Sequence, residues 1–178
     1  MRKIVLTYGS IAGILMISMF LISFSLMEQG ILSFDNSELF GYTTMIVVLS
    51  LIFFGMKSFR DKHNNGTMTF GKGFKVGISI AAVASLFYAG GWEVYYNSTD
   101  LKETFMQRYT ELTIKKMQHD GKSQEEIDKK REEMKMFAEW YKNPFIRFGM
   151  TLLEILPVGL LITLISAGIL RKKEVLPV

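Results

Sequence analysis

Residue types that commonly build catalytic and metal sites are scarce in this 178-residue sequence. It contains no cysteine, which excludes disulfides and thiolate metal ligands. It has only two histidines, His63 and His119, and it contains neither an HExxH zinc motif nor a nucleophile elbow. We therefore expect no catalytic residue, no metal and no cofactor.

Charge is missing from long parts of the chain, and these parts decide its class. Apolar stretches cover residues 4–27, 39–56, 76–96 and 148–170; the only charged residues in them are Glu93 and Glu154. A helix needs about 20 largely apolar residues to cross about 30 Å of hydrocarbon. The sequence predicts an all-α, polytopic integral membrane protein with four transmembrane helices.

The chain is too short to hold a separate soluble catalytic domain beside these spans, so we expect one membrane domain over residues 1–178. The first apolar run is longer than the core of a cleaved signal peptide, which favours a retained helix. The net charge of +4 comes from basic residues that flank the spans. We therefore expect contact with membrane lipids and no binding of nucleic acid.

Positive charge marks one side of the membrane. Arg2 and Lys3 precede the first span, and Arg171, Lys172 and Lys173 follow the last. The connection between the second and third spans holds five more basic residues, Lys57, Arg60, Lys62, Lys72 and Lys75. The charged residues of the loop after the first span are all acidic: Glu28, Asp35 and Glu38. The positive-inside rule then places both termini in the cytoplasm and residues 97–147 outside.

The two histidines lie on opposite sides in this topology and cannot share a metal ion. We expect the five loop residues to contact lipid headgroups or a partner.

The outer segment is predicted to form an extracytoplasmic αα-hairpin over residues 98–143. Apolar residues recur at helical spacing on both sides of Gly121, and Ser123 with Glu126 has the pattern of a capping box. The two apolar stripes favour mutual packing; contact with the bilayer surface or a partner is the alternative. Five aromatic residues are expected at the membrane interface, Trp92, Tyr95, Tyr96, Trp140 and Tyr141.

Glu93 and Glu154 are the candidate functional acids inside the bilayer. Intramembrane acids commonly serve proton relay, ion binding or headgroup recognition. Pro157 lies three residues after Glu154, and a helix broken beside an acid is typical of transport sites. Both acids are expected in the outer leaflet, within reach of each other or of Glu28. The structural alternative is that they pair with Arg147, Lys102 or serine and threonine hydroxyl groups and hold helices together.

Small residues mark expected helix contacts. Gly9 and Gly13 form a GxxxG motif in the first span. In the third span five small residues recur every four positions, Gly73, Gly77, Ala81, Ser85 and Ala89. Such stripes allow close approach of a second backbone, and we expect packing within the bundle rather than self-association.

Four segments carry a family resemblance: GYTTM at 41–45, FFGMKSFRDK at 53–62, TFGKGFKVG at 69–77 and GWEVYY at 91–96. They resemble a family of bacterial inner-membrane proteins, domain-of-unknown-function family 4199. The resemblance covers nearly the whole chain and implies four helices in a Gram-negative inner membrane. It implies no catalytic residue. It also suggests a genomic neighbour of the polyprenyl-phosphate glycosyltransferase class.

These observations favour a non-enzymatic accessory or scaffold subunit. Its expected partner is another membrane protein, such as a polyprenyl-phosphate glycosyltransferase, or a second copy of itself. The alternative is a small transporter or lipid-handling protein that uses Glu154 and Glu93. An enzyme acting alone ranks third, because the two acids have no recognisable companion.

Overall fold

The computed structural model describes residues 1–172, apart from the side chains of Glu28, Phe34 and Asp35. In these residues the protein consists of α-helices joined by short loops. Within these residues no β-strand forms, and only an isolated bridge joins Met68 to Lys172. In chain order the helices are α1 (Arg2–Glu28), α2 (Phe34–Leu49), α3 (Leu51–His63), α4 (Phe70–Ser98), α5 (Leu101–His119), α6 (Gln124–Tyr141) and α7 (Pro144–Leu170).

Four helical units are long and apolar enough to cross a membrane, which confirms the all-α polytopic prediction. They cover Arg2–Met27, Asn36–His63, Phe70–Ser98 and Pro144–Leu170. Each is longer than its apolar stretch, because a helix continues past the first charged residue while a hydropathy window stops there. The second unit joins α2 to α3 at Ser50, whose N–H still donates to the carbonyl of Ile46 at 3.0 Å.

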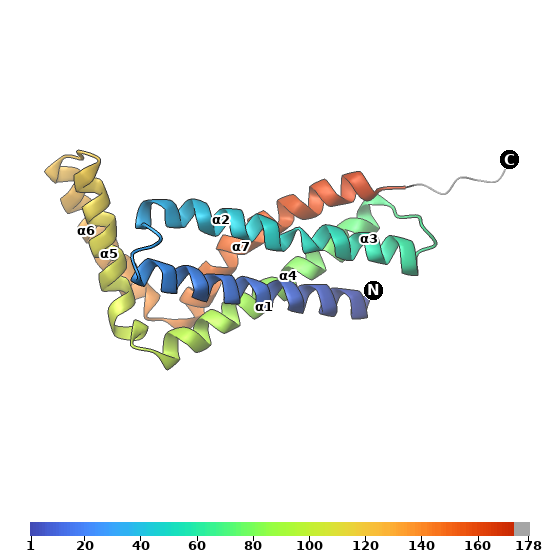
Figure 1. Ribbon diagram of the computed structural model, residues 1–178, viewed down its shortest axis with the longest axis horizontal. Coiled ribbons are helices and arrows are strands. Elements are labelled where there is room, and N and C mark those ends of the chain that lie inside the picture. The colour runs from blue at the N-terminus through green and yellow to red at the C-terminus, as the bar shows by residue number, and fades with distance from the viewer. Residues whose placement is uncertain (173–178) are drawn as a thin grey trace.

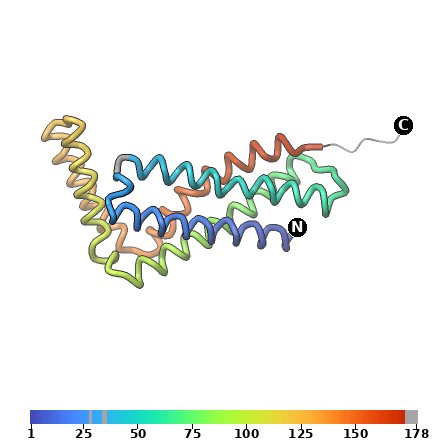
Figure 2. The backbone as a smooth tube through the Cα atoms, in the orientation of Figure 1, coloured from blue at the N-terminus to red at the C-terminus, as the bar shows by residue number. Residues whose placement is uncertain are grey.

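The long helices lie side by side, and the α5–α6 hairpin crosses one end of them (Figure 1). The N-terminus and the C-terminal end of α7 lie at the opposite end, and the backbone trace shows the same arrangement (Figure 2). At that end the backbones of Met68 and Lys172 exchange two hydrogen bonds of 2.9 Å, which tie the α3–α4 loop to the end of α7. Lys173 lies outside the described residues.

α4 is the central helix, and it packs α1 and α7 against different faces. A Cβ added to Gly9 of α1 would lie 2.6 Å from the Cβ of Val83, and one added to Gly13 would overlap Phe87. On the other face, a Cβ at Gly77 would lie 2.7 Å from a side-chain carbon of Thr163 in α7. Both small-residue motifs therefore contact helices of the same chain. Close backbone contact of this kind stabilises helices in lipid, where burial of apolar surface contributes little.

The rest of the third-span stripe is also buried: Gly73, Ala81, Ser85 and Ala89. Ala81 faces Gly159 of α7, whereas Gly73 is covered by Met68 and by Met56 of α3. The Ser85 hydroxyl is satisfied by donating to the carbonyl of Ala81 at 2.8 Å. In contrast, the Thr163 hydroxyl is buried and has no hydrogen-bond partner among the described residues.

α7 corrects one expectation, because it runs without interruption from Pro144 to Leu170 and Pro157 lies inside it. Proline removes one backbone hydrogen bond, and neighbouring helices commonly hold such a helix together within a membrane protein. Pro157 therefore does not create a broken helix of the kind found in transporters.

The hairpin packs its two helices against each other through Ile114 of α5 and Ile127 and Met134 of α6, all of which are buried. Gly121 has φ +70° in the turn between them. The capping box is present: the Ser123 side chain accepts from the N–H of Glu126, and the Glu126 carboxylate accepts from the N–H of Ser123 at 3.0 Å. These hydrogen bonds lower the pKa of Glu126 below its ordinary value.

Candidate functional site

Glu93 of α4 and Arg147 of α7 form an ion pair at the hairpin end of the bundle. The two Glu93 carboxylate oxygens accept from the Arg147 Nε at 2.7 Å and from a terminal nitrogen at 2.6 Å. The Arg147 side chain is only 3% exposed. Two parallel bonds between a guanidinium and a carboxylate give both strength and a fixed orientation. Of the two roles considered for Glu93, the structure therefore shows the pairing that holds helices together.

Arg147 also anchors the hairpin to the bundle. Its other terminal nitrogen donates to the backbone carbonyl of Tyr141, the last residue of α6, at 2.9 Å. The guanidinium carbon lies 4.0 Å from the centroid of the Tyr96 ring, a distance typical of a cation–π contact. One side chain thus links α4, α6 and α7.

The aromatic residues near this pair lie mainly inside the protein, which corrects the expectation of an interfacial belt. Trp92, Tyr96 and Tyr141 are buried, and the indole N–H of Trp92 donates to the Tyr141 hydroxyl at 2.9 Å. Tyr95 is half-buried, and Trp140 is 59% exposed. The belt was expected because aromatic residues at helix ends commonly face headgroups. Here the hairpin packs its own Tyr141 against Trp92 and Tyr96 of α4, so that all three rings are buried. Burial raises the pKa of Tyr141 above its ordinary value.

Glu154 lies in a different environment, about two turns beyond Arg147 along α7. It lines an open cavity of about 740 Å³ whose wall includes residues of α1, α2, α4, α5, α6 and α7. Its side chain is exposed in this cavity and has no hydrogen bond or ion pair to any described residue. The structure therefore separates the two acids: Glu93 is paired with Arg147, and Glu154 faces open space.

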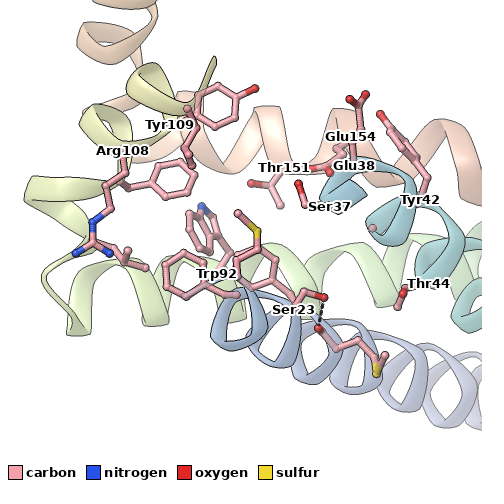
Figure 3. A pocket seen from close by; sticks show the side chains of 18 of the residues that line it. Ser23, Ser37, Glu38, Tyr42, Thr44, Trp92, Arg108, Tyr109, Thr151 and Glu154 are labelled. Atoms are coloured by element: carbon pink, nitrogen blue, oxygen red, sulfur yellow. Dashed lines mark hydrogen bonds between the residues drawn. The ribbon is translucent and has the colours of Figure 1, made fainter. Parts of the chain in front are cut away.

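The cavity is lined by both apolar and polar side chains. The apolar ones come mainly from the second half of α1 and from α5, with Met45 from α2; they include Met16, Met19, Phe20, Phe24, Leu101, Phe105 and Leu112. The charged residues come from α2, α5 and α7, and so do most of the hydroxyl groups. They include Ser37, Glu38, Tyr42, Arg108, Glu111, Lys115, Lys116, Thr151 and Glu154. In Figure 3, Glu154, Glu38 and Tyr42 lie toward one end of the view and Arg108 and Tyr109 toward the other, with Thr151 and Ser37 between them.

Most of the polar residues that line the cavity were not predicted as site residues from the sequence. Glu38 entered the prediction only as a loop charge that set the topology, and Thr151, Tyr42 and Lys115 were not singled out. These residues lie on three elements that are distant in the sequence, and α2 and α5 meet the rest only in the folded bundle. The one usable signal was the acidic residue Glu154 within an apolar span.

The five basic residues expected in the loop between the second and third spans lie in the last turns of α3 and the first turns of α4. These turns are at the opposite end of the bundle from the hairpin (Figure 1). Lys57, Lys62 and Lys75 are exposed. Arg60 donates to Asp61 at 2.6 Å and to the carbonyl of Leu170 at 3.5 Å, while Lys72 binds the side chain of Asn64. Two of the five residues therefore stabilise the loop itself, and three remain available to headgroups or a partner.

No group of three His, Asp or Glu side chains converges within the part of the chain that the structure describes, so no metal centre can be assigned there. The cavity is amphipathic, because apolar side chains line it together with charged and hydroxyl groups.

Four membrane-length helices, an outer hairpin and a cavity at the junction define a polytopic α-helical membrane protein. The chain belongs to the family described as protein of unknown function (DUF4199), which it matches over residues 7–172. No curated protein and no solved structure matches the chain.

Proposed function

We propose that this protein is a lipid-handling membrane protein that binds a membrane amphiphile in the cavity between the bundle and the hairpin. The observation that carries this proposal is the cavity itself, with about 740 Å³ of space, many apolar lining residues and the exposed carboxylate of Glu154. Ligand pockets of this size are typically lined by apolar residues with a few polar groups that orient the ligand.

The position of the cavity suits an amphiphile. Met16, Phe20 and Met45 belong to spans that cross the hydrocarbon, and methionine and phenylalanine adapt well to flexible acyl chains. Lys115 of α5 and Glu38 at the start of α2 belong to the end of the bundle where headgroups lie. A molecule with a tail and a charged head matches both halves, whereas a small polar solute or a bare ion matches only one.

Glu154 supports binding over mere packing. A carboxylate in a membrane span is costly unless it is paired or faces a polar cavity, and such residues commonly mark ligand pathways. Glu93 satisfies this requirement with Arg147. Glu154 has no such partner among the described residues, which leaves it available to a ligand.

We place the protein in the bacterial inner membrane with both termini in the cytoplasm. The basic α3–α4 connection and Arg2 support this orientation, because lysine and arginine concentrate in short cytoplasmic loops. The hairpin, within residues 97–147, then lies in the periplasm, and the cavity opens toward the outer leaflet.

The absence of cysteine makes this topology directly testable. In intact spheroplasts, a membrane-impermeant maleimide should label Lys129→Cys in the hairpin and should not label Lys62→Cys until the cells are opened. Both positions are exposed, so accessibility on the protein itself is matched. Labelling of Lys62→Cys alone in intact spheroplasts would invert the orientation.

The lipid proposal is tested by filling the cavity. Gly41 lines it, and a Cβ at Gly41 meets nothing within 4 Å, so Gly41→Trp places a large side chain in the open space. Gly168→Trp is the matched control, because Gly168 is equally open but does not line the cavity. We expect native mass spectrometry to detect lipid on the wild type and the control, and much less on Gly41→Trp. Equal lipid retention by all three proteins would refute the proposal.

An accessory subunit is the second candidate, and exposed apolar side chains at the base of the hairpin favour it. Met136 and Trp140 on α6 are 57% and 59% exposed. Aromatic residues and methionine are enriched in protein interfaces. Co-purification in mild detergent tests this role: a stoichiometric membrane partner, such as a polyprenyl-phosphate glycosyltransferase, or a homo-oligomer that Trp140→Ser disrupts would support it.

A further inference from the structure

We infer that the cavity selects phospholipids whose headgroup carries an ammonium group, with the carboxylates of Glu154 and Glu38 as its counterions. This inference rests on the lipid binding proposed above and names the class of headgroup. It follows from the placement of charges around one continuous space.

The two carboxylates come from different helices and line the same cavity. Glu154 belongs to α7 and Glu38 to α2, and these helices are in contact. Both side chains are exposed, and neither has a hydrogen bond or ion pair to a described residue. Figure 3 shows them toward the same end of the view as the hydroxyl-bearing side chain of Tyr42, with Thr151 next to them near the middle. This end of the cavity therefore presents acceptors to a ligand.

Thr151 presents an acceptor because its own proton is already used. Its hydroxyl donates to the carbonyl of Arg147 at 3.0 Å, which leaves the oxygen lone pairs for a donor. An ammonium group has three donors and no acceptor, so it matches a set of carboxylate and hydroxyl oxygens. Tyr42, Tyr88 and Trp92 also line the cavity, and aromatic faces attract ammonium groups.

The basic residues of the cavity come from another element, α5, which supplies Arg108, Lys115 and Lys116. The same helix also contributes one acid to the cavity lining, Glu111, which accepts from the side chain of Gln107 at 3.2 Å. Acids on α2 and α7 and bases on α5 form a bipolar lining. A zwitterionic headgroup matches it, with its phosphate toward α5 and its ammonium toward Glu154. A purely anionic headgroup can place its phosphate in the same way, but it supplies no cation for the two carboxylates.

The test compares lipids that differ only in the headgroup. Wild-type protein in detergent is titrated with phosphatidylethanolamine, phosphatidylglycerol and N-acetylated phosphatidylethanolamine of identical acyl chains, and the bound fraction is read by native mass spectrometry. We expect phosphatidylethanolamine to bind about fivefold more tightly than either of the others, the scale of one partly exposed ion pair.

Variants assign the preference to the two acids. In Glu154→Gln and in Glu38→Gln the ratio should fall toward one, while total lipid binding persists. Glu139→Gln is the control, because Glu139 lies on the exposed face of α6, pairs with Lys142 and does not line the cavity. Because Glu38 lies at the exposed start of α2, its variant gives a readout even if Glu154→Gln fails to fold.

Failure of this inference and failure of the proposed function give different results. If wild-type protein binds all three lipids equally, or prefers phosphatidylglycerol, the headgroup assignment is overturned and lipid binding stands. Retention of the fivefold ratio in both variants also overturns the assignment. If no lipid binds to wild-type protein, both the inference and the proposed function are wrong.

Discussion

The ion pair between Glu93 and Arg147 allows a sharp prediction for Arg147→Met. This change keeps an unbranched side chain of moderate size and removes the guanidinium. It eliminates two hydrogen bonds to Glu93 at 2.7 and 2.6 Å, one to the Tyr141 carbonyl at 2.9 Å, and the contact over the Tyr96 ring. Glu93 is left as a carboxylate that is only 18% exposed.

The expected loss of stability comes mainly from the Glu93 carboxylate, which stays buried without its partner. Removing one partner of a buried ion pair typically destabilises a protein by 3–5 kcal/mol, mostly because the other charge stays buried. Glu93 keeps some exposure and a 3.3 Å bond from the side chain of Asn97, so we expect the lower end, about 3 kcal/mol. For a chain of this length, such a loss lowers the midpoint of thermal unfolding by roughly 6–12 °C.

The assay is thermal unfolding in detergent, followed by intrinsic tryptophan fluorescence. Lys142→Met is the matched control: Lys142 pairs with Glu139 at the same 2.6 Å, but both side chains are 69% exposed, and such pairs contribute less than about 1 kcal/mol. The double variant Arg147→Met with Glu93→Gln should regain part of the lost stability, because the stranded charge is gone. If Arg147→Met is as stable as the control, or if the double variant is worse than the sum of the single changes, the reasoning is wrong.

Further predictions concern contacts elsewhere in the chain. Gly77→Val should destabilise the bundle by about 1–3 kcal/mol, because its Cβ would lie 2.7 Å from Thr163, and a detergent melting curve measures this. Thr163→Val should be neutral or raise the melting temperature, since it replaces a buried hydroxyl that has no partner among the described residues; a clear loss of stability would show a hidden partner. Tyr141→Phe removes the acceptor of an indole N–H and should cost about 1 kcal/mol in the same assay. The lowered pKa of Glu126 means that its stabilisation is present above the ordinary glutamate pKa and is lost as the pH falls through the folded value. Circular dichroism of the hairpin signal between pH 6 and 2 should therefore show a transition that Ser123→Ala weakens.

The sequence was sufficient to predict the four spans and the hairpin, because both depend on local patterns. Apolar length alone predicts a membrane helix, and Gly121 with the Ser123–Glu126 capping box marks the hairpin turn in a few adjacent residues. Span boundaries were less predictable. The sequence predicted residues 57–63 as part of a charged loop, but they form the last turns of α3. The charged residues end the apolar stretch without ending the helix.

The two intramembrane acids could not be distinguished from the sequence. Each is the single charged residue of an otherwise apolar stretch, so hydropathy gives them the same weight. Glu93 meets Arg147 across a separation of 54 residues, and this depends on how α4 crosses α7. The location of the aromatic residues could not be predicted for the same reason. Their position at a helix end is visible in the sequence, but their burial depends on how the hairpin packs in the folded protein.

The contrast between these acids also explains why a rigid clamp and an open cavity lie next to each other. The clamp of Glu93 and Arg147 fixes the first turn of α7 against α4 and holds the end of α6 in place. α5 follows α4 after a short turn and must then pass across the ends of α1 and α2, where its basic face completes the cavity wall. Loosening the clamp should therefore change lipid binding as well as stability, although neither Glu93 nor Arg147 lines the cavity. If Arg147→Met were to keep wild-type lipid affinity at temperatures where it remains folded, the clamp would serve stability alone and the cavity would be shaped by α1, α2 and α7.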